Sequence, residues 1–222
     1  MSSVIEAIHL GGVNCYLFAA GDGCILVDTG FMAKRPKLEK SLESLGCTPG
    51  KLKLIVLTHG DSDHTGNADF LRNKYGCKIV MHGSDLGMVE RGDMGWNRKA
   101  KPDKYSVIFR LIGFLAKAAA KKAEFEKFKP DLIVDEGFDL SPYGLEAKIV
   151  HIPGHSKGSI GVLTKDGKLC CGDFAYNVPG FQFIDDRDDQ RKSLDKVKRL
   201  KIETLYPGHG KPFPMKVLLK RS

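Results

Sequence analysis

A short turn rich in potential metal ligands, placed directly after an apolar run, constrains this chain more than any other feature. The run at residues 54–57 reads as a buried strand, and the turn at residues 58–67 holds two imidazoles and two carboxylates within six residues. Imidazole and carboxylate together are the usual ligand set for zinc, manganese or iron. The sequence therefore predicts a metal site at the end of a strand.

Four further turns combine a strand-like run, a glycine and a candidate functional side chain. In chain order these side chains and their sequences are Asp28 in VDTG, His155 in PGH, Asp173 in CGD and His209 in YPGHG. Ligands at the ends of strands can converge at one edge of a sheet, so these turns are expected to form a single site with the first one.

The five motifs, in this order, resemble the metal-binding signature of the metallo-β-lactamase superfamily, H-x-H-x-D-H, with Asp61 in place of the middle histidine. The resemblance covers roughly residues 4–85 and 131–213. It implies an α/β fold, a four-layer αββα sandwich. We expect one domain over residues 1–222, interrupted by a basic helical insertion at about 86–130.

The resemblance also implies two divalent metal ions and assigns their ligands. His59, Asp61 and His155 would hold the first, Asp63, His64 and His209 the second, and Asp173 would bridge both. Zinc is the first expectation, and the hard oxygen of Asp61 keeps iron and manganese open. Asp63 is the expected catalytic residue, orienting the attacking hydroxide, while Asp28 would brace the ligands through hydrogen bonds.

Composition sets the broader limits. The chain has 222 residues with 42% apolar content, enough for one sizeable core. It has no apolar run near the ~18–20 residues that span a bilayer, and its N-terminus lacks the pattern of a signal peptide. The six cysteines are scattered without a C-x-x-C pair, which favours reduced thiols and a cytoplasmic location. A homodimer stays open.

The segment between the second and third motifs is strongly basic. Residues 86–129 contain 11 Lys and Arg against 5 Asp and Glu, out of a net charge of +8 for the chain. Within it, apolar residues recur at helical spacing, which predicts an amphipathic helix over residues 105–128 with Phe109 and Phe114 at the margins of its apolar stripe. Three interpretations of this helix stay open: an ordinary surface helix, a cap over the metal edge and, more weakly, a helix that lies on a membrane surface.

The resemblance implies a metal-dependent hydrolase that uses a metal-bound hydroxide on a small ester, thioester or lactone. Three alternatives remain: a phosphodiesterase or nuclease, a mononuclear iron redox enzyme such as a persulfide dioxygenase, and a non-catalytic metal-binding module. The basic insertion keeps nucleic acid open as a partner because phosphate attracts Lys and Arg, although a small molecule is the expected substrate.

Two other features carry no chemistry in this interpretation. Residues 154–158 match G-x-S-x-G, but a proline precedes them and a strand-like run follows where a nucleophile elbow needs a helix, so Ser156 is rejected as a nucleophile. The remaining histidines, His9, His82 and His151, are expected to be structural.

Overall fold

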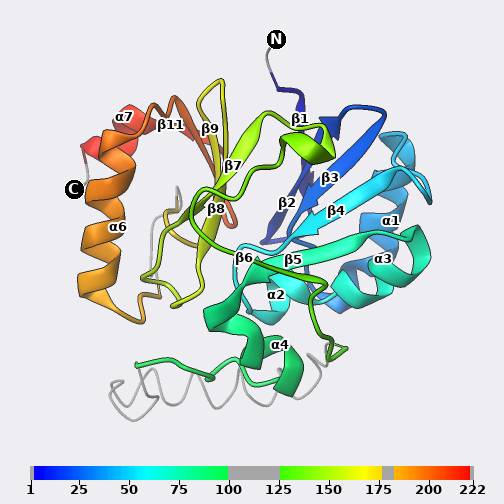
Figure 1. The fold of residues 1–222 in the computed structure, drawn as a ribbon, viewed down its shortest axis with the longest axis horizontal. Coiled ribbons are helices and arrows are strands. Elements are labelled where there is room, and N and C mark those ends of the chain that lie inside the picture. Colours follow the sequence, from blue (N-terminus) through cyan, green and yellow to red (C-terminus); the bar gives the residue numbers. More distant parts are fainter. Residues whose placement is uncertain (1–2, 100–125, 177–182, 221–222) are drawn as a thin grey trace.

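Two β-sheets pack face to face in the computed structural model, which describes residues 3–99, 126–176 and 183–220. The first sheet has the order β1-β2-β3-β4-β5-β6 and the second the order β11-β10-β9-β8-β7. Helices α1 and α3 cover the outer face of the first sheet, and α6 and α7 cover that of the second (Figure 1). This is the predicted four-layer αββα arrangement.

The strands of the first sheet are β1 (Ile5–His9), β2 (Asn14–Ala20), β3 (Gly23–Val27), β4 (Leu52–Val56), β5 (Lys78–His82) and β6 (Leu132–Val134). Those of the second are β7 (Ala147–His151), β8 (Ile160–Thr164), β9 (Lys168–Gly172), β10 (Thr204–Pro207) and β11 (Phe213–Pro214). The α-helices are α1 (Arg35–Ser44), α2 (Ser62–Thr65), α3 (Ala68–Tyr75), α4 (Leu86–Arg91), α6 (Arg187–Arg199) and α7 (Met215–Leu219). Short 3₁₀ turns are η1 (Met32–Lys34), η2 (Gly83–Asp85) and η4 (Ser141–Tyr143).

Strand direction brings the functional turns to one edge. β3, β4, β5 and β6 run parallel to one another, as do β9 and β10 in the second sheet. The carboxyl ends of parallel strands meet at the same edge of a sheet. In Figure 1 the short helix α2, which follows β4, lies at that edge below the strands, with α4 near it.

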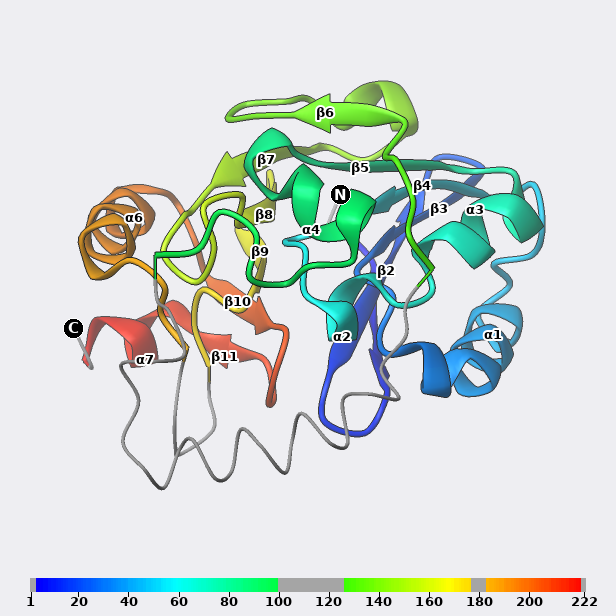
Figure 2. The same cartoon turned by 90° about the horizontal axis from the view of Figure 1, so that it is seen from below.

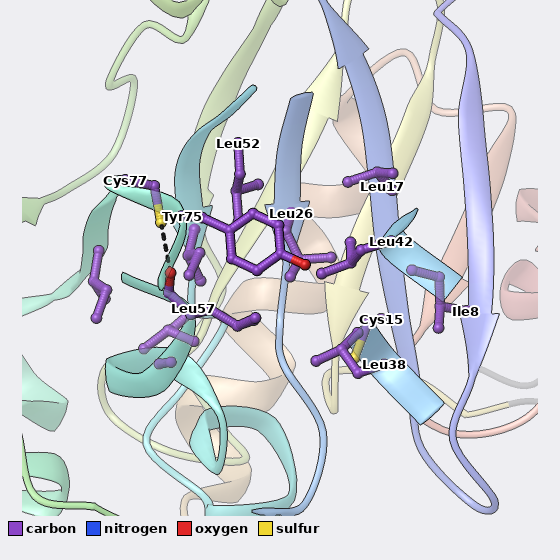
Figure 3. Packing of buried hydrophobic residues seen from close by; sticks show 14 of the residues in the cluster. Ile8, Cys15, Leu17, Leu26, Leu38, Leu42, Leu52, Leu57, Tyr75 and Cys77 are labelled. Atoms are coloured by element: carbon purple, nitrogen blue, oxygen red, sulfur yellow. Dashed lines mark hydrogen bonds between the residues drawn. The ribbon is translucent and has the colours of Figure 1, made fainter. Parts of the chain in front are cut away.

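Three buried clusters fill the three spaces between the four layers. Between the first sheet and its helices, Leu38, Leu42 and Tyr75 pack against Leu26 and Leu52 (Figure 3). Cys77, just after α3, donates a weak Sγ hydrogen bond to the carbonyl of Leu71 at 3.9 Å, as the dashed line in Figure 3 shows. The packing of apolar side chains on both faces of the first sheet explains why β4 is an almost continuous apolar run.

The other two clusters complete the sandwich. Phe18 and Leu54 of the first sheet meet Val162 and Cys170 of the second, and Val197 of α6 packs with Leu205 behind the second sheet. All six cysteines are free thiols, as the sequence predicted.

The strand predicted at residues 54–57 corresponds to β4 (Leu52–Val56). The ligand motif that follows it is partly helical, because α2 forms a separate turn of helix before α3. Gly66 lies between α2 and α3, where a Cβ would come within 2.6 Å of the Met32 amide nitrogen and 2.7 Å of the Gly30 carbonyl oxygen. Only glycine fits so close to this neighbouring backbone. Gly66 keeps helical backbone angles, and the break between α2 and α3 falls at Asn67, whose φ is −118°.

The predicted helix over residues 105–128, with Phe109 and Phe114, lies largely outside the described residues. The described parts of the insertion are α4, the loop at residues 92–99 and residues 126–130. That loop is non-helical. A single domain over residues 1–222 stays a prediction. Across the described ranges, no helix is both long and apolar enough to cross a bilayer. Figure 2 shows the fold from below, with α2 and α4 both near the edge where the functional turns meet.

Candidate metal centre

The fold brings all seven predicted ligands together at one edge of the sandwich. His59 follows β4, Asp61 precedes α2, and Asp63 and His64 lie in α2 itself. The other three, His155, Asp173 and His209, lie in the turns after β7, β9 and β10. Each sheet therefore contributes ligands, and the site lies where the two sheets face each other.

We call His59, Asp61 and His155 the first ligand group. Asp61 Oδ2 lies 3.0 Å from His155 Nε2 and 3.6 Å from His59 Nε2, while Asp173 Oδ2 lies 3.8 Å from His155 Nε2. Two donor atoms that share a tetrahedral ion at 2.0–2.2 Å are about 3.3–3.6 Å apart. The spacing within the first ligand group is close to that value.

We call Asp63, His64 and His209 the second ligand group. Asp63 Oδ2 lies 3.7 Å from His64 Nε2 and 3.3 Å from His209 Nε2. Asp173 is again a neighbour, with Oδ1 3.3 Å from His64 Nε2 and Oδ2 3.4 Å from His209 Nε2. Asp173 therefore lies between the two groups, in the position that a bridging carboxylate needs.

Backbone carbonyls fix the ring orientation of two of the histidines. His155 Nδ1 lies 3.0 Å from the Phe183 carbonyl oxygen, and His209 Nδ1 lies 2.5 Å from that of Gly12. A carbonyl oxygen only accepts, so each Nδ1 must carry the hydrogen. In the neutral rings the lone pair is then on Nε2, the atom that faces the carboxylates.

Asp28 fixes the other two histidines through a connected set of hydrogen bonds. His64 Nδ1 lies 2.8 Å from Asp28 Oδ2, and the Thr58 hydroxyl donates to the same oxygen at 2.8 Å. Since the Thr58 hydrogen is used there, Thr58 Oγ1 accepts from His59 Nδ1 at 2.9 Å. All four histidines thus use Nδ1 for a fixed acceptor and direct Nε2 at the carboxylates, the arrangement that hydrogen-bonding partners impose on metal-binding histidines. His155 Nε2 donates to Asp61 Oδ2 at 3.0 Å, and this atom would offer its lone pair to a metal once that hydrogen is lost.

The backbone at Asp28 is unusual and well held. Its φ of 61° is in the left-handed region, which few residues other than glycine adopt. Asp28 Oδ1 also accepts from the Thr58 amide at 2.8 Å, so both carboxylate oxygens are engaged. Such conformations cluster at functional sites, where surrounding structure over-determines them.

Two buried ring nitrogens lack hydrogen-bond partners. Within the described part of the chain, His59 Nε2 and His64 Nε2 are both buried and make no hydrogen bond. Buried polar atoms in native proteins almost always have a partner. A cation between the ligands would supply the missing interaction, so the residues present fit a metal site.

Carboxylates outnumber the nearby cationic side chains at this edge. Burial alone would lower the pKa of His209, but Asp173 and Asp63 raise it to about 10. Burial likewise opposes ionisation of Asp61, yet His155, His59 and Arg98 hold its pKa well below the usual range. The site thus favours positive charge, which bound divalent ions would supply while displacing protons from the rings.

Glycine at position 208 lets the last motif approach the others. A Cβ there would lie 2.4 Å from Asp173 Oδ1 and 2.6 Å from His64 Cε1. Across the sandwich, Asn14 of β2 donates through Nδ2 to the carbonyls of Pro207 at 3.0 Å and Gly210 at 2.6 Å. The turn that carries His209 is therefore fixed to the first sheet.

Besides Gly12, whose carbonyl accepts from His209, sequence reasoning missed three residues that touch the ligands. Arg98 donates through Nη2 to Asp61 Oδ1 at 2.6 Å. The Tyr176 hydroxyl donates to Asp173 Oδ2, and its ring lies edge-on to that of His209 at a centroid distance of 5.3 Å. Phe183 provides the carbonyl for His155. Tyr176 could have been suspected because it is three residues after Asp173, whereas nothing local marks Arg98 or Phe183.

Asp85 was also missed, and it holds the turns of the first ligand group together. Its Oδ2 accepts from the Gly60 amide at 3.2 Å and the Ser156 hydroxyl at 2.6 Å, and its Oδ1 accepts from the Gly158 amide at 2.8 Å. Gly60 follows His59 and Ser156 follows His155. The Ser156 hydroxyl thus serves a structural contact, which supports its rejection as a nucleophile.

His82 and His151 differ from the four predicted ligands in how their rings are used. Together with Asp135 they form a third cluster of potential ligands, and the two rings stack at 4.1 Å. However, His82 Nδ1 accepts from the Ser84 amide at 3.1 Å, so its Nε2 carries the hydrogen and faces Asp135. His151 Nε2 donates to the Lys157 carbonyl at 2.8 Å. Neither Nε2 lone pair is available for a metal.

Comparison with known proteins agrees with this architecture. The family model for the metallo-beta-lactamase superfamily matches residues 9–209. A Caenorhabditis elegans protein named Beta-lactamase-like protein 2 homolog is 27% identical over 202 residues, covering 90% of this chain and 57% of the relative. Its Drosophila melanogaster counterpart is 26% identical, covering 92% and 61%. The chain thus spans less than two thirds of these two relatives.

Other matches extend over more of the relative or concern solved structures. The acyl-coenzyme A thioesterase MBLAC2 of Bos taurus is 25% identical over 220 residues, covering 90% of this chain and 74% of the relative. A metallo-beta-lactamase family protein from Thermus thermophilus superposes with a TM-score of 0.72 at 21% identity, covering 99% of this chain and 79% of that one. A subclass B3 metallo-beta-lactamase of Bradyrhizobium japonicum gives 0.68 at 24% identity, covering 92% and 74%.

The structural matches support the fold, and the family model covers most of the chain together with all seven predicted ligands. The ordered motifs, the αββα layers and the shared edge where the ligands meet lead to one assignment. This chain belongs to the metallo-β-lactamase superfamily.

Proposed function

We propose that this protein is a hydrolase that binds two divalent metal ions, zinc first, and cleaves a small thioester, with esters and lactones as the next candidates. The single observation that carries the metal part is the common orientation of His59, His64, His155 and His209. Each uses Nδ1 to donate to a fixed acceptor and presents Nε2 to the ligand carboxylates.

The ligand roles proposed are those expected from the sequence. The first ligand group would hold one ion, the second group the other, and Asp173 would bridge them. When bound, such ions supply Lewis acidity and lower the pKa of water toward ~7. Iron and manganese stay alternatives because Asp61 adds a hard oxygen.

The chain's own residues divide the remaining work. Asp63, whose Oδ2 lies 3.3 Å from His209 Nε2, is assigned both to hold an ion and to orient the attacking hydroxide. Asp28 keeps His64 and, through Thr58, His59 in the required tautomer. The Tyr176 hydroxyl donates to Asp173 Oδ2 from the side of His209 and is assigned to hold that carboxylate in its orientation.

Thioesters are placed first among substrates because of one relative. The similar protein in Bos taurus is named an acyl-coenzyme A thioesterase, and at 25% identity this supports a reaction class without fixing an acyl group. Phosphodiester hydrolysis is the second candidate, supported by the net charge of +8 and the basic insertion. We also propose a cytoplasmic location, and a homodimer stays open.

The test is metal analysis followed by a substrate panel. The purified protein would be assayed for bound metal and then incubated with an acyl-coenzyme A, an aryl ester, a lactone and an aryl phosphodiester, with and without a chelator. We expect about two ions per chain and chelator-sensitive thioester cleavage. A Lys198→Gln variant serves as the control, since Lys198 is an exposed residue of α6 and belongs to neither ligand group. Phosphodiester cleavage without thioester cleavage would reverse the order of the two candidates.

A further inference from the structure

Arg98 reaches the metal centre from a segment that carries none of the sequence motifs. Its Nη2 donates to Asp61 Oδ1 at 2.6 Å, and its side chain is only 10% exposed. The guanidinium also lies over the ring of Phe183, at 4.8 Å from the ring centroid. A buried guanidinium needs a partner to balance its charge. Among the described residues, Asp61 is the carboxylate paired with it.

The two oxygens of Asp61 are used differently. Oδ1 accepts from Arg98, while Oδ2 faces the Nε2 atoms of His155 and His59 at 3.0 and 3.6 Å. Asp61 therefore presents one oxygen to the first ligand group. A carboxylate engaged in this way contributes one donor atom, as an imidazole does, and its negative charge is offset by the guanidinium.

The loop that delivers Arg98 is held at several points. Asn97 has a φ of 59°, turning the backbone, and its Nδ2 donates to the Ser84 carbonyl at 3.2 Å. Trp96 packs on Gly87, where a Cβ would lie 2.3 Å from the indole ring. On the other side, the Lys99 amide donates to Asp185 Oδ2 at 3.0 Å. These contacts fix the backbone on both sides of Arg98.

Phe183 links Arg98 to the first ligand group a second time. Its ring lies beneath the guanidinium, and its carbonyl accepts from His155 Nδ1 at 3.0 Å. Asp61, His155, Phe183 and Arg98 thus form a closed ring of contacts. A change in the charge of Asp61, His155 or Arg98 therefore alters the interactions of the other two.

We propose that Arg98 and Asp61 work as one unit that takes the place of a single neutral histidine in the first ligand group. Arg98 is a positioning residue: it makes Asp61 a single-oxygen ligand and removes its excess charge. This inference rests on the metal centre proposed above. It also has a direct consequence for Asp61→His, which would leave Arg98 buried, unpaired and close to the proposed cation.

The test is a double-mutant cycle on metal binding. Wild-type protein, Asp61→His, Arg98→Met and the double variant would each be stripped of metal, checked by circular dichroism and titrated with zinc against a chromophoric chelator that resolves two binding steps. Lys99→Met is the matched control, since Lys99 is a neighbouring cation with a 62% exposed side chain that pairs with Asp186 instead of a ligand.

We expect Asp61→His alone to weaken the first-group binding step by about 10- to 100-fold, the range seen when partners of metal ligands are removed. Adding Arg98→Met should recover most of that loss, because the site then has a neutral imidazole and no unpaired guanidinium. Lys99→Met should bind zinc like the wild type.

The outcomes separate the two proposals. Suppose that the wild type binds zinc in two steps. If Asp61→His then binds zinc as tightly as the wild type, or if the effects of the two substitutions simply add, the Asp61–Arg98 unit is refuted while the metal centre stands. If the wild type binds no zinc, iron or manganese, the metal centre and this inference both fail. If the first-group variants fold poorly, cobalt spectra of Arg98→Met and Arg98→Lys decide: a coordination spectrum identical to wild type in both refutes the unit.

Discussion

The two ligand groups have the same number of histidines but are held in different ways. In the first group, His59 and His155 donate to neutral acceptors, the Thr58 hydroxyl and the Phe183 carbonyl, and the carboxylate of Asp61 is paired with Arg98. In the second, His64 donates to a buried carboxylate, Asp28. The second group is therefore more anionic, and we expect it to bind its cation more tightly.

The largest effect should come from the residue that both groups share. Asp173→Ala removes a donor from each group, so we expect loss of both ions and of activity. His64→Ala should also abolish activity but remove about one ion, because the first group keeps its ligands. Metal content per chain, measured by plasma mass spectrometry, distinguishes these cases.

The control for Asp173→Ala is Asp195→Ala, an exposed aspartate on α6. It should keep metal and turnover at the wild-type level. If Asp173→Ala retained two ions, the bridging assignment would be wrong. If Asp173→Ala and His64→Ala both kept full metal and full turnover, the assignment of all seven ligands would be wrong.

The next prediction tests whether the negative charge of Asp28 strengthens cation binding at the second ligand group. Asn tolerates the left-handed backbone better than most residues, so Asp28→Asn should preserve the fold while removing the carboxylate that accepts from His64. We expect the metal affinity to fall by about 10- to 100-fold, mainly at the second group. Two-step zinc titration measures this, and an equal loss at both groups would remove the distinction drawn here.

Asp85→Asn is the corresponding change for the first group. Asp85 is 1% exposed and accepts three hydrogen bonds from residues in the turns that carry His59 and His155. An amide nitrogen would face one of those donors, at a cost of roughly 1–3 kcal/mol in the free energy of unfolding. Urea denaturation checks the stability, and zinc titration should show weakening confined to the first group. Weakening of the second group alone would contradict this assignment.

The smallest effect is expected for Tyr176→Phe. The hydroxyl contacts Asp173, which both groups share, but it contributes no donor atom to either. We expect both ions to remain and kcat/KM to fall by about 10-fold, the loss of roughly one hydrogen bond to a charged group. Unchanged kinetics with unchanged metal would show that the hydroxyl is only structural.

The difference between the two ligand groups could not be predicted from the sequence. The turns that carry the ligands could be predicted, because each follows an apolar run. Residues 54–57 mark β4, and glycines mark the ends of the strands near Asp28, His155, Asp173 and His209. These signals are local. The four-layer fold followed from the order of those motifs and their resemblance to a known family.

Arg98, Phe183 and Asp85 had no comparable signal. Each reaches the site from a loop or 3₁₀ turn whose placement depends on contacts between distant residues, such as Asn97 with Ser84 or Lys99 with Asp185. The tautomers of the histidines are equally non-local, since Gly12 and His209 are 197 positions apart. Consequently the seven ligand candidates were identified, while the difference between the two groups was not.

Asp28 has a further consequence for how metal ions would bind to the two ligand groups. Its Oδ2 accepts from His64 directly and from Thr58, which in turn accepts from His59, so one carboxylate oxygen ends a hydrogen-bond chain from each group. A cation on one imidazole would make that ring a stronger donor to Asp28 and would weaken the hydrogen bond that Asp28 accepts from the other chain. Binding of the two proposed ions would then be energetically linked. Such linkage is reciprocal, so each ion would change the affinity for the other by the same factor.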